Sequence, residues 1–246
     1  MAIHDFTSER LFVDAPLSEG ARVSCTPEQA NYLKNVLRLD AGAQILVFNG
    51  RDGEWLAQLV EAGKRTVVLA AERQTRPQQG GPDLVYVFAP LKRSRLDYMV
   101  QKATEMGAAR IVPVLTRHTI AERVNLDRMR ANVIEAAEQC GILRVPRVDE
   151  PQKLGKLLET WDPARQLVFC DEAADLKSPI EALSALQAGP VAVLIGPEGG
   201  FSPEERQQIL SLPVARAISL GPRIMRADTA AVAALALVNA VLGDWR

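Results

Sequence analysis

Two glycine-rich segments near the end of the chain combine residues that could bind a ligand and act on it. The first, residues 196–200, has the sequence GPEGG and follows the apolar run at 191–195. Its glycines lack a Cβ atom and therefore let a flat ligand approach the backbone closely. Glu198 adds a carboxylate that could orient a ligand or accept a proton; the alternative is a loop carboxylate that only accepts backbone amides. A plain turn needs fewer glycines, so a ligand-binding loop is the favoured interpretation.

The second segment, residues 220–226, has the sequence LGPRIMR and also follows an apolar run. It ends at Arg226, directly before a helix that we expect Asp228 to cap. A cation is unfavourable there, because the N-terminus of a helix carries partial positive charge. A residue that is unfavourable for its own helix, and that lies beside a glycine loop, is typical of a functional site. The alternative for Arg226 is an arginine that only extends into solvent.

The elements around these segments predict an α/β fold. Strands are expected at 84–89, 110–115, 166–170, 191–195 and 214–220, and helices at 94–106, 127–140, 179–186, 203–210 and 229–242. Short apolar strands that alternate with helices form parallel sheets covered on both faces. Ligands bind such sheets at the carboxyl ends of the strands, so both segments are expected to line one cleft. Ser202 and Glu205 predict a capping box at the start of the helix at 203–210.

The first third of the chain shows a different pattern. Short apolar or alternating runs at 45–48, 55–60 and 66–71 indicate strands, and a helix is expected at 27–36. Asn49-Gly50 lies between the first two runs and favours a hairpin. We expect a small β-barrel domain over residues 1–74 and a second domain over residues 75–246, joined by a polar linker at 73–83.

Two familiar nucleotide sites are excluded because their motifs are missing. A dinucleotide-binding Rossmann fold has G-x-G-x-x-G after its first strand, whereas the sequence after 84–89 is PLKRS. A P-loop has Lys and then Ser or Thr directly after its last glycine, and neither glycine segment has them. The predicted ligand site therefore lies late in the chain and is not of the triphosphate-binding type.

The composition is that of a globular protein. The chain has 246 residues, 48% of them hydrophobic, and a formal net charge of −1, which by itself does not indicate a nucleic-acid partner. Between residues 92 and 130, however, nine basic residues accompany four acidic ones. The apolar stretch at 229–242 is too short to span a bilayer, and no targeting segment or membrane partner is expected. Cys25, Cys140 and Cys170 lack the spacing of a metal site and indicate a reducing, cytoplasmic location.

The two glycine segments together strongly resemble the motifs of one known family. GPEGGFSPEE followed by LGPRIMRADTA is similar to the RsmE family, SPOUT-class methyltransferases that make N3-methyluridine in 16S ribosomal RNA. The stretches KRSRLDYMVQKATEMG and EAAEQCG resemble two helices of that family. NYLKNVLRLDAGAQILVFNGRDGEWLAQL resembles its N-terminal PUA-like β-barrel. The resemblance covers nearly the whole chain.

The resemblance implies a fold, a cofactor and a site. The C-terminal domain would contain a deep trefoil knot, although chains generally do not thread loops. The protein would be a homodimer that acts on 16S ribosomal RNA or the small ribosomal subunit, and S-adenosyl-L-methionine would bind among the knot loops. Arg226 and Glu198 are the implied catalytic residues. The implied cofactor-binding residues are Phe169, Glu172, Ile195, Gly196, Pro197, Glu198, Gly199, Gly200, Leu220, Gly221, Ile224, Met225 and Arg226.

RNA contacts are expected from basic residues in both domains. The candidates are Arg10 and Arg38 in the barrel, and Lys92, Arg93 and Arg95 after the strand at 84–89. His118 could also reach RNA, and its alternative is a surface histidine without a role.

Three positions depart from the family pattern. Met225 replaces a usual leucine, Ala227-Asp228 replaces a usual Thr-Glu, and Ile142 takes the place of a common arginine. If that arginine holds RNA, Arg144 or Arg147 would have to take over its role. Two other functions remain open: a knotted methyltransferase for another RNA or another position, and a non-catalytic RNA-binding factor in ribosome assembly. The sequence does not identify the target uridine, the form of the RNA substrate or the general base.

Overall fold

The computed structural model describes residues 8–63, 66–120, 123–174 and 178–245, and of Arg93 only the backbone. The chain divides into two compact units. Unit 1 comprises the described residues up to Gly80 together with Ala137–Val145, and unit 2 comprises Gly81–Ala136 and the described residues from Pro146 onward. The expected division into 1–74 and 75–246 did not foresee the segment 137–145, which joins unit 1 because Ala137 and Leu143 pack against Phe48.

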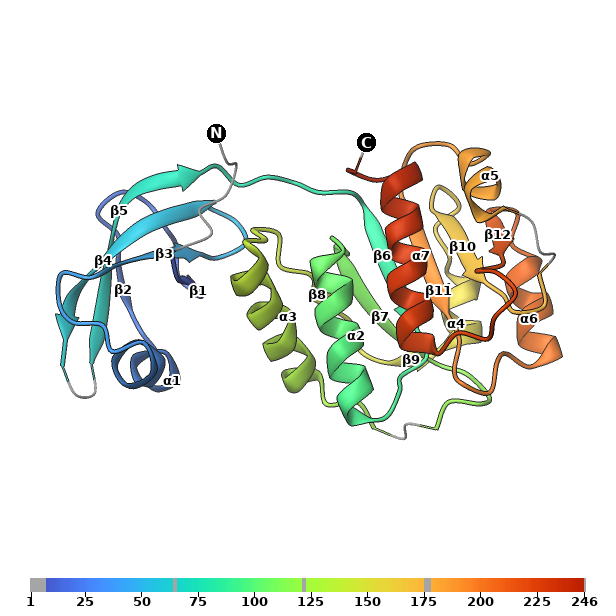
Figure 1. Cartoon of the computed structure of the whole chain (residues 1–246), viewed down its shortest axis with the longest axis horizontal. Coiled ribbons are helices and arrows are strands. Elements are labelled where there is room, and N and C mark those ends of the chain that lie inside the picture. The colour runs from blue at the N-terminus through green and yellow to red at the C-terminus, as the bar shows by residue number, and fades with distance from the viewer. Residues whose placement is uncertain (1–7, 64–65, 121–122, 175–177, 246) are drawn as a thin grey trace. The chain divides into compact units, whose positions relative to one another are not determined.

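Unit 1 contains a curled five-stranded sheet (Figure 1). Its order is β1 (Arg10–Phe12), β3 (Gln44–Phe48), β4 (Glu54–Ala62), β5 (Val67–Arg76) and β2 (Arg22–Ser24). The predicted hairpin is confirmed, since β3 and β4 pair antiparallel with Phe48 opposite Glu54. The Oδ1 atom of Asn49 closes the turn by accepting the amides of Arg51 at 2.9 Å and Asp52 at 2.8 Å.

Two expectations for unit 1 need correction. The predicted helix at 27–36 is an α-helix only over α1 (Pro27–Asn31) and continues as a π-helix, η1 (Tyr32–Val36). The predicted linker at 73–83 begins too early, because β5 runs to Arg76. Polar residues there hid the strand, whose end is held by pairing with β4 rather than by apolar side chains. The short strands β1 and β2 were not predicted.

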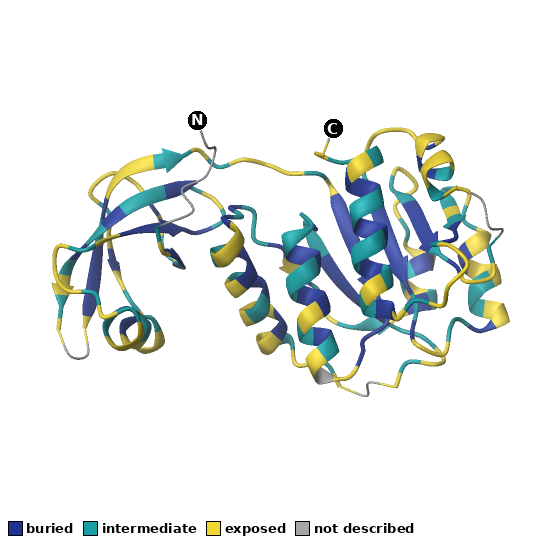
Figure 2. Cartoon of the chain, in the orientation of Figure 1, coloured by how far each residue is buried: buried dark blue, intermediate teal, exposed yellow. Residues whose placement is uncertain are grey.

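Unit 2 contains the predicted parallel sheet. Its order is β12 (Ala215–Ile218), β10 (Gln166–Cys170), β11 (Val191–Ile195), β6 (Leu84–Phe88), β7 (Arg110–Leu115) and β8 (Arg147–Val148), with β9 (Gln152–Lys153) also paired to β7. Every pairing in this sheet is parallel. Figure 2 shows the central strands buried and the outer helix faces exposed, as expected for a sheet covered on both faces.

The helices of unit 2 cover this sheet. They are α2 (Arg93–Glu105), α4 (Leu154–Glu159), α5 (Pro179–Ser184), α6 (Pro203–Leu210) and α7 (Ala227–Val241), and α3 (Leu126–Cys140) begins in this unit. Leu154 of α4 and Ile209 of α6 pack against Val85 and Leu167 on one face. The helix α7 packs against β11 and contacts α2 and α5, and it crosses in front of the strands in Figure 1. No helix in the described ranges has the length and apolarity that crossing a bilayer requires.

Most elements of unit 2 match their predictions, and two details differ. The short strands β8 and β9 and the helix α4 were not predicted. The helix α7 begins at Ala227 with Arg226 as its N-cap, so the expectation that Asp228 caps it was wrong. Asp228 lies in the first turn, where its Oδ1 accepts the amide of Thr229 at 2.9 Å. The trefoil knot stays a prediction.

Candidate functional site

A cavity of about 780 Å³ opens where the carboxyl ends of three neighbouring strands meet. The strands β12, β10 and β11 are adjacent in the sheet, so the loops that follow them lie side by side. Residues 170–174, 195–201 (without Gly199) and 218–227 line the cavity, together with Arg206 and Ala230. This edge is where parallel α/β sheets bind ligands. The two glycine segments therefore contribute to one cavity.

All but two of the predicted cofactor residues line this cavity. Those that do are Glu172, Ile195, Gly196, Pro197, Glu198, Gly200, Leu220, Gly221, Ile224, Met225 and Arg226. Phe169 is buried in β10 instead, where its ring meets Phe201 edge-on at 5.2 Å between centroids. Gly199 faces His118, and a Cβ atom on Gly199 would lie 3.3 Å from the His118 Cβ.

Glycine is required at two positions of the first loop. A Cβ atom on Gly196 would lie only 2.5 Å from the ring of Phe201. Gly200 has a φ of +68°, a left-handed conformation that other residues rarely adopt, and its Cβ would lie 2.8 Å from Oε1 of Glu172. These glycines let the loop pack tightly against its own neighbours, in addition to any approach of a ligand.

The capping box predicted after this loop is present. The Ser202 Oγ accepts the amide of Glu205 at 3.2 Å, and the Glu205 carboxylate accepts the amide of Ser202 at 3.0 Å. Ser202 is buried and Pro203 occupies the first turn. The cap fixes where α6 begins and hence where the loop at 196–201 must end.

An ion pair between the buried Asp171 and the partly exposed Arg206 supports the loop after β10 and was not predicted. Asp171 follows β10 directly, and its side chain is 4% exposed. Its Oδ2 accepts Nε of Arg206 at 2.9 Å, and its Oδ1 accepts the amide of Ala173 at 3.1 Å. An acid directly after a buried strand was the signal available in the sequence.

Burial raises the pKa of the neighbouring Cys170 thiol to about 12, so this thiol stays protonated at neutral pH and is a poor nucleophile.

The two predicted catalytic residues lie on the rim of the cavity in different settings. Glu198 is exposed and forms an ion pair with Arg95 of α2. Arg226 is exposed at the N-cap of α7, and its side chain forms no cap hydrogen bond. A carboxylate and a cation therefore border the same opening.

The predicted RNA-contacting residues are not equally available. Lys92 is exposed at the N-cap of α2, and Arg38 is exposed with a φ of +57°. Arg95 is engaged by Glu198, and the side chain of Arg93 lies outside the described residues.

Arg10 is buried, and the expectation that it faces RNA is not met. Its Nε donates to Glu54 at 3.1 Å, with side-chain exposures of 6% and 3%. Arg76 donates to the same carboxylate at 2.6 Å. Burial raises the pKa of Glu54, but hydrogen bonds from Arg76, Thr75 and Arg10 outweigh burial and hold it below its usual value. Arg10 therefore neutralises the buried carboxylate of Glu54 inside unit 1.

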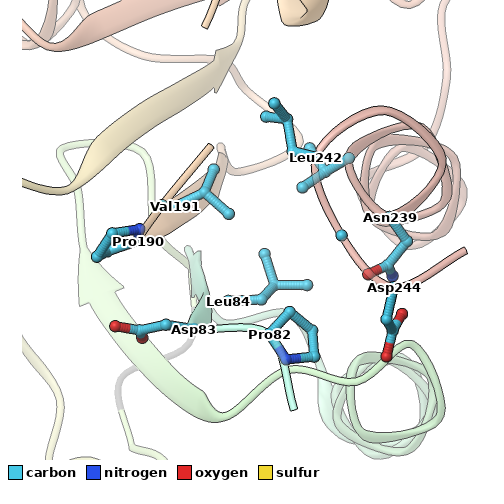
Figure 3. Close-up of a pocket in the computed structure, with 11 residues that line it drawn as sticks. Pro82, Asp83, Leu84, Pro190, Val191, Asn239, Leu242 and Asp244 are labelled. Atoms are coloured by element: carbon cyan, nitrogen blue, oxygen red, sulfur yellow. The ribbon is translucent and has the colours of Figure 1, made fainter. Parts of the chain in front are cut away.

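A second cavity, of about 360 Å³, lies at the opposite edge of the sheet, near the start of β6 and β11 and the end of α7 (Figure 3). Its lining includes Pro82, Leu84, Val191 and Leu242 and contains none of the predicted site residues. The buried Asn239 donates from Nδ2 to the Met106 carbonyl at 2.7 Å, while its Oδ1 has no partner in the described structure. An ordered water ordinarily satisfies such an oxygen.

The described residues also contain no cluster of three or more His, Cys, Asp or Glu side chains suited to a metal.

Comparisons with known proteins agree with the geometry. Residues 79–239 match the RNA methyltransferase domain family, and residues 26–72 match the RNA methyltransferase PUA domain. The ribosomal RNA small subunit methyltransferase E of Rickettsia conorii is 30% identical over 232 residues, which cover 94% of each chain. The protein of that name from Synechocystis is 33% identical, over 90% of this chain and 74% of the relative.

A solved structure gives the same result. The ribosomal RNA small subunit methyltransferase E of Neisseria gonorrhoeae, bound to S-adenosyl methionine, has a TM-score of 0.84 and 25% identity to this chain. The alignment covers 97% of this chain and 100% of that one. These matches confirm the resemblance inferred from the two glycine segments. The chain belongs to the ribosomal RNA small subunit methyltransferase E family.

Proposed function

We propose that this protein transfers a methyl group from S-adenosylmethionine to N3 of one uridine in 16S ribosomal RNA. One observation carries the proposal: both glycine loops and Arg226 border a single cavity at the carboxyl ends of β10, β11 and β12. The Neisseria relative binds the same cofactor, and the named relatives act on small-subunit ribosomal RNA. The choice of N3 rests on the resemblance to the family.

The residues of the cavity fit this cofactor. Its volume of about 780 Å³ lies in the range of small-molecule sites. Ile195, Leu220 and Met225 offer apolar walls for an adenosine, and Gly196 and Gly200 let the loop pack closely enough to shape the cavity. S-adenosylmethionine, when bound, supplies a methyl group that its sulfonium already activates. The chain has to hold the uridine in line with that methyl group, which is catalysis by proximity and orientation.

The uridine sets the harder requirement, because its N3 carries a proton at neutral pH and the anion is the nucleophile. Arg226 places a permanent positive charge at the rim, where it would stabilise the developing anion. Glu198 is the candidate for accepting the proton, directly or through a water. Its ion pair with Arg95 has to open before the carboxylate can do so.

The start of α2 and the exposed Arg38 are the proposed RNA contacts. Lys92 lies directly before α2, and Arg95 lies in its first turn. The side chain of Arg95 forms an ion pair with Glu198 on the cavity rim. Phosphate contacts at these positions would orient the RNA without reading its sequence. The target uridine has to leave any base stack, because pairing hides N3.

A cytoplasmic homodimer completes the proposal. Ile224, on the loop that lines the cavity, is 99% exposed, and Tyr98 of α2 and Ile180 of α5 are also exposed large apolar side chains. A second copy would cover such side chains. Light scattering coupled to gel filtration tests this part: twice the 26.8 kDa chain mass is expected, and a monomer at micromolar concentration would contradict it.

Two measurements separate the proposal from its rivals. Calorimetric titration with S-adenosylmethionine should show one site per chain, whereas a non-catalytic assembly factor would show no binding. Mass spectrometry of ribosomal RNA from a deletion strain should show the loss of one N3-methyluridine. Loss of a different modification would assign the enzyme to another target, and an unchanged profile would reject the proposed function.

A further inference from the structure

The turn that follows β7 holds the glycine loop from outside the cavity. In this turn, at residues 116–119, the Thr119 Oγ1 accepts the amide of Thr116 at 2.9 Å. His118 projects from it, and its Nδ1 lies 3.1 Å from the Gly199 carbonyl oxygen and 3.0 Å from that of Gly200. Both partners are acceptors, so Nδ1 must carry the proton and donate.

A second bond ties the same turn to the far end of the loop. The backbone amide of Arg117 donates to Oε1 of Glu205 at 2.8 Å. Glu205 is the capping-box residue whose other oxygen accepts the amide of Ser202. Residues 117 and 118 therefore hold the glycine loop at Gly199 and Gly200 and again where α6 begins.

These contacts restrict a segment that its composition makes flexible. Two adjacent glycines can adopt many backbone conformations, and only some of them leave the cavity open. The bond ties two successive carbonyl oxygens to His118, a side chain that does not itself line the cavity. Gly199 also lies so close to His118 that a Cβ atom would be 3.3 Å from it. His118 thus acts on the loop by a directed hydrogen bond and by contact.

We propose that His118 is a positioning residue that fixes the glycine loop in its ligand-binding conformation. It acts through the Gly199 and Gly200 carbonyl groups and does not touch the ligand. The inference rests on the proposed function in that the ligand of the loop is S-adenosylmethionine. It replaces the expectation that His118 reaches RNA with a role toward the cofactor.

Two variants of nearly equal shape isolate the hydrogen bond. In His118→Asn the side-chain amide nitrogen occupies the place of Nδ1 and can still donate. In His118→Asp an oxygen occupies that place, cannot donate at neutral pH and repels both carbonyl oxygens. Because His118 is exposed, neither change should unfold the chain. Melting temperatures of the free variants check this directly.

Three readouts give the outcome: affinity for S-adenosylmethionine by calorimetry, amide hydrogen exchange over residues 196–202, and the ¹⁵N signals of the His118 ring. We expect His118→Asn to bind within about threefold of the native chain, and His118→Asp to bind about tenfold or more weakly, a factor in the range of one hydrogen bond. Exchange over 196–202 should rise in the Asp variant, and the native ring should carry its proton on Nδ1.

The opposite results overturn the proposal. Native affinity and native exchange in His118→Asp would show that the bond does not hold the loop, and equal losses in Asn and Asp would show that the ring alone matters. If the native chain itself fails to bind S-adenosylmethionine, the proposed function fails. The exchange and ¹⁵N readouts, which need no ligand, still decide whether His118 positions the loop.

Discussion

Arg226 occupies a position that helix chemistry disfavours. An N-cap side chain normally accepts a hydrogen bond from the first-turn amides, and a guanidinium cannot accept one. Its charge also opposes the positive end of the dipole of α7. The same position places a permanent cation on the cavity rim. The proposed reaction needs a cation there, because negative charge develops on the uridine.

Arg226→Ala should therefore separate turnover from binding. We expect methyl transfer to fall by about 10²–10³-fold, the usual loss on removing one stabilising donor, while affinity for S-adenosylmethionine stays within about tenfold. Single-turnover methylation and calorimetry measure the two effects. Arg216→Ala is the control, because Arg216 is exposed on β12 away from the cavity lining and should retain normal rates. Near-normal methylation by Arg226→Ala would remove Arg226 from the mechanism.

Gly196 tests the packing of the first loop. A methyl group there would lie 2.5 Å from the Phe201 ring, so Gly196→Ala should displace the ring or the loop. We expect a stability loss of about 1–3 kcal/mol, as for overpacking, and at least tenfold weaker cofactor binding. Gly80→Ala is the control, because nothing lies within 4 Å of its Cβ position. Native affinity in Gly196→Ala would show that the loop does not shape the ligand site.

The positions of single residues were predictable where their neighbours in sequence fix them, whereas their roles stay predictions. Glu198, Gly200 and Arg226 belong to local motifs, and all three line the cavity. Arg10 was misplaced because its partner Glu54 is 44 residues away, and a buried cation cannot be told from an exposed one without that partner. Asp171 was missed for a similar reason, since Arg206 lies 35 residues further on.

The helix α6 depends on a cap that the sequence specifies by itself. Ser202→Ala removes one half of the capping box and leaves the Glu205 amide without its acceptor. We expect a loss of about 1 kcal/mol in the free energy of unfolding, measured by urea denaturation, with a smaller loss of cofactor affinity through the adjoining loop. Ser178→Ala should cost little, because Ser178 is the N-cap of α5 but makes no cap hydrogen bond. Equal losses in both variants would contradict the role of the cap.

Elements were predictable where local signals and tertiary structure agree. The strand β11 and the helix α6 have their predicted bounds, since apolar composition and the capping box act locally. The start of α7 was wrong because Asp228 has the residue type of a cap, whereas the cavity loop fixes the backbone up to Arg226. The end of β5 was missed because pairing with β4, rather than its polar sequence, makes it a strand.

The stability of unit 1 depends on the buried carboxylate of Glu54. Hydrogen bonds hold the pKa of Glu54 below its usual value. This stabilisation is complete above the unfolded pKa of about 4.3 and is lost as pH falls through the lower folded value. Unit 1 should therefore lose stability below about pH 4, which amide exchange in β4 and β5 can follow.

Glu54→Gln should remove that acid-dependent loss and cost about 3 kcal/mol at neutral pH, as expected on breaking a buried ion pair. Glu61→Gln is the control, because its pair with Arg22 is exposed and should be worth less than about 1 kcal/mol. An unchanged acid profile in Glu54→Gln would assign the loss to another group.

The sequence could not predict that residues 137–145 belong to unit 1. Residues 137–140 are the last turn of α3, residues 141–145 follow it, and only contacts such as Leu143 with Phe48 assign them to the first unit. The parallel sheet and the two-part organisation were predictable because they follow from the order of strands and helices.

In the proposed function, the cavity beside Arg226 directs a methyl group to N3 of a single uridine. The most direct test incubates the purified chain with S-adenosylmethionine and small-subunit ribosomal RNA from a strain that lacks the protein, as free RNA and as assembled subunits. Nucleosides from the digested RNA are then identified by mass spectrometry. We predict up to one N3-methyluridine per RNA molecule with the native chain and almost none with Arg226→Ala. Methylation at another position, or none with either substrate, would refute the proposed function.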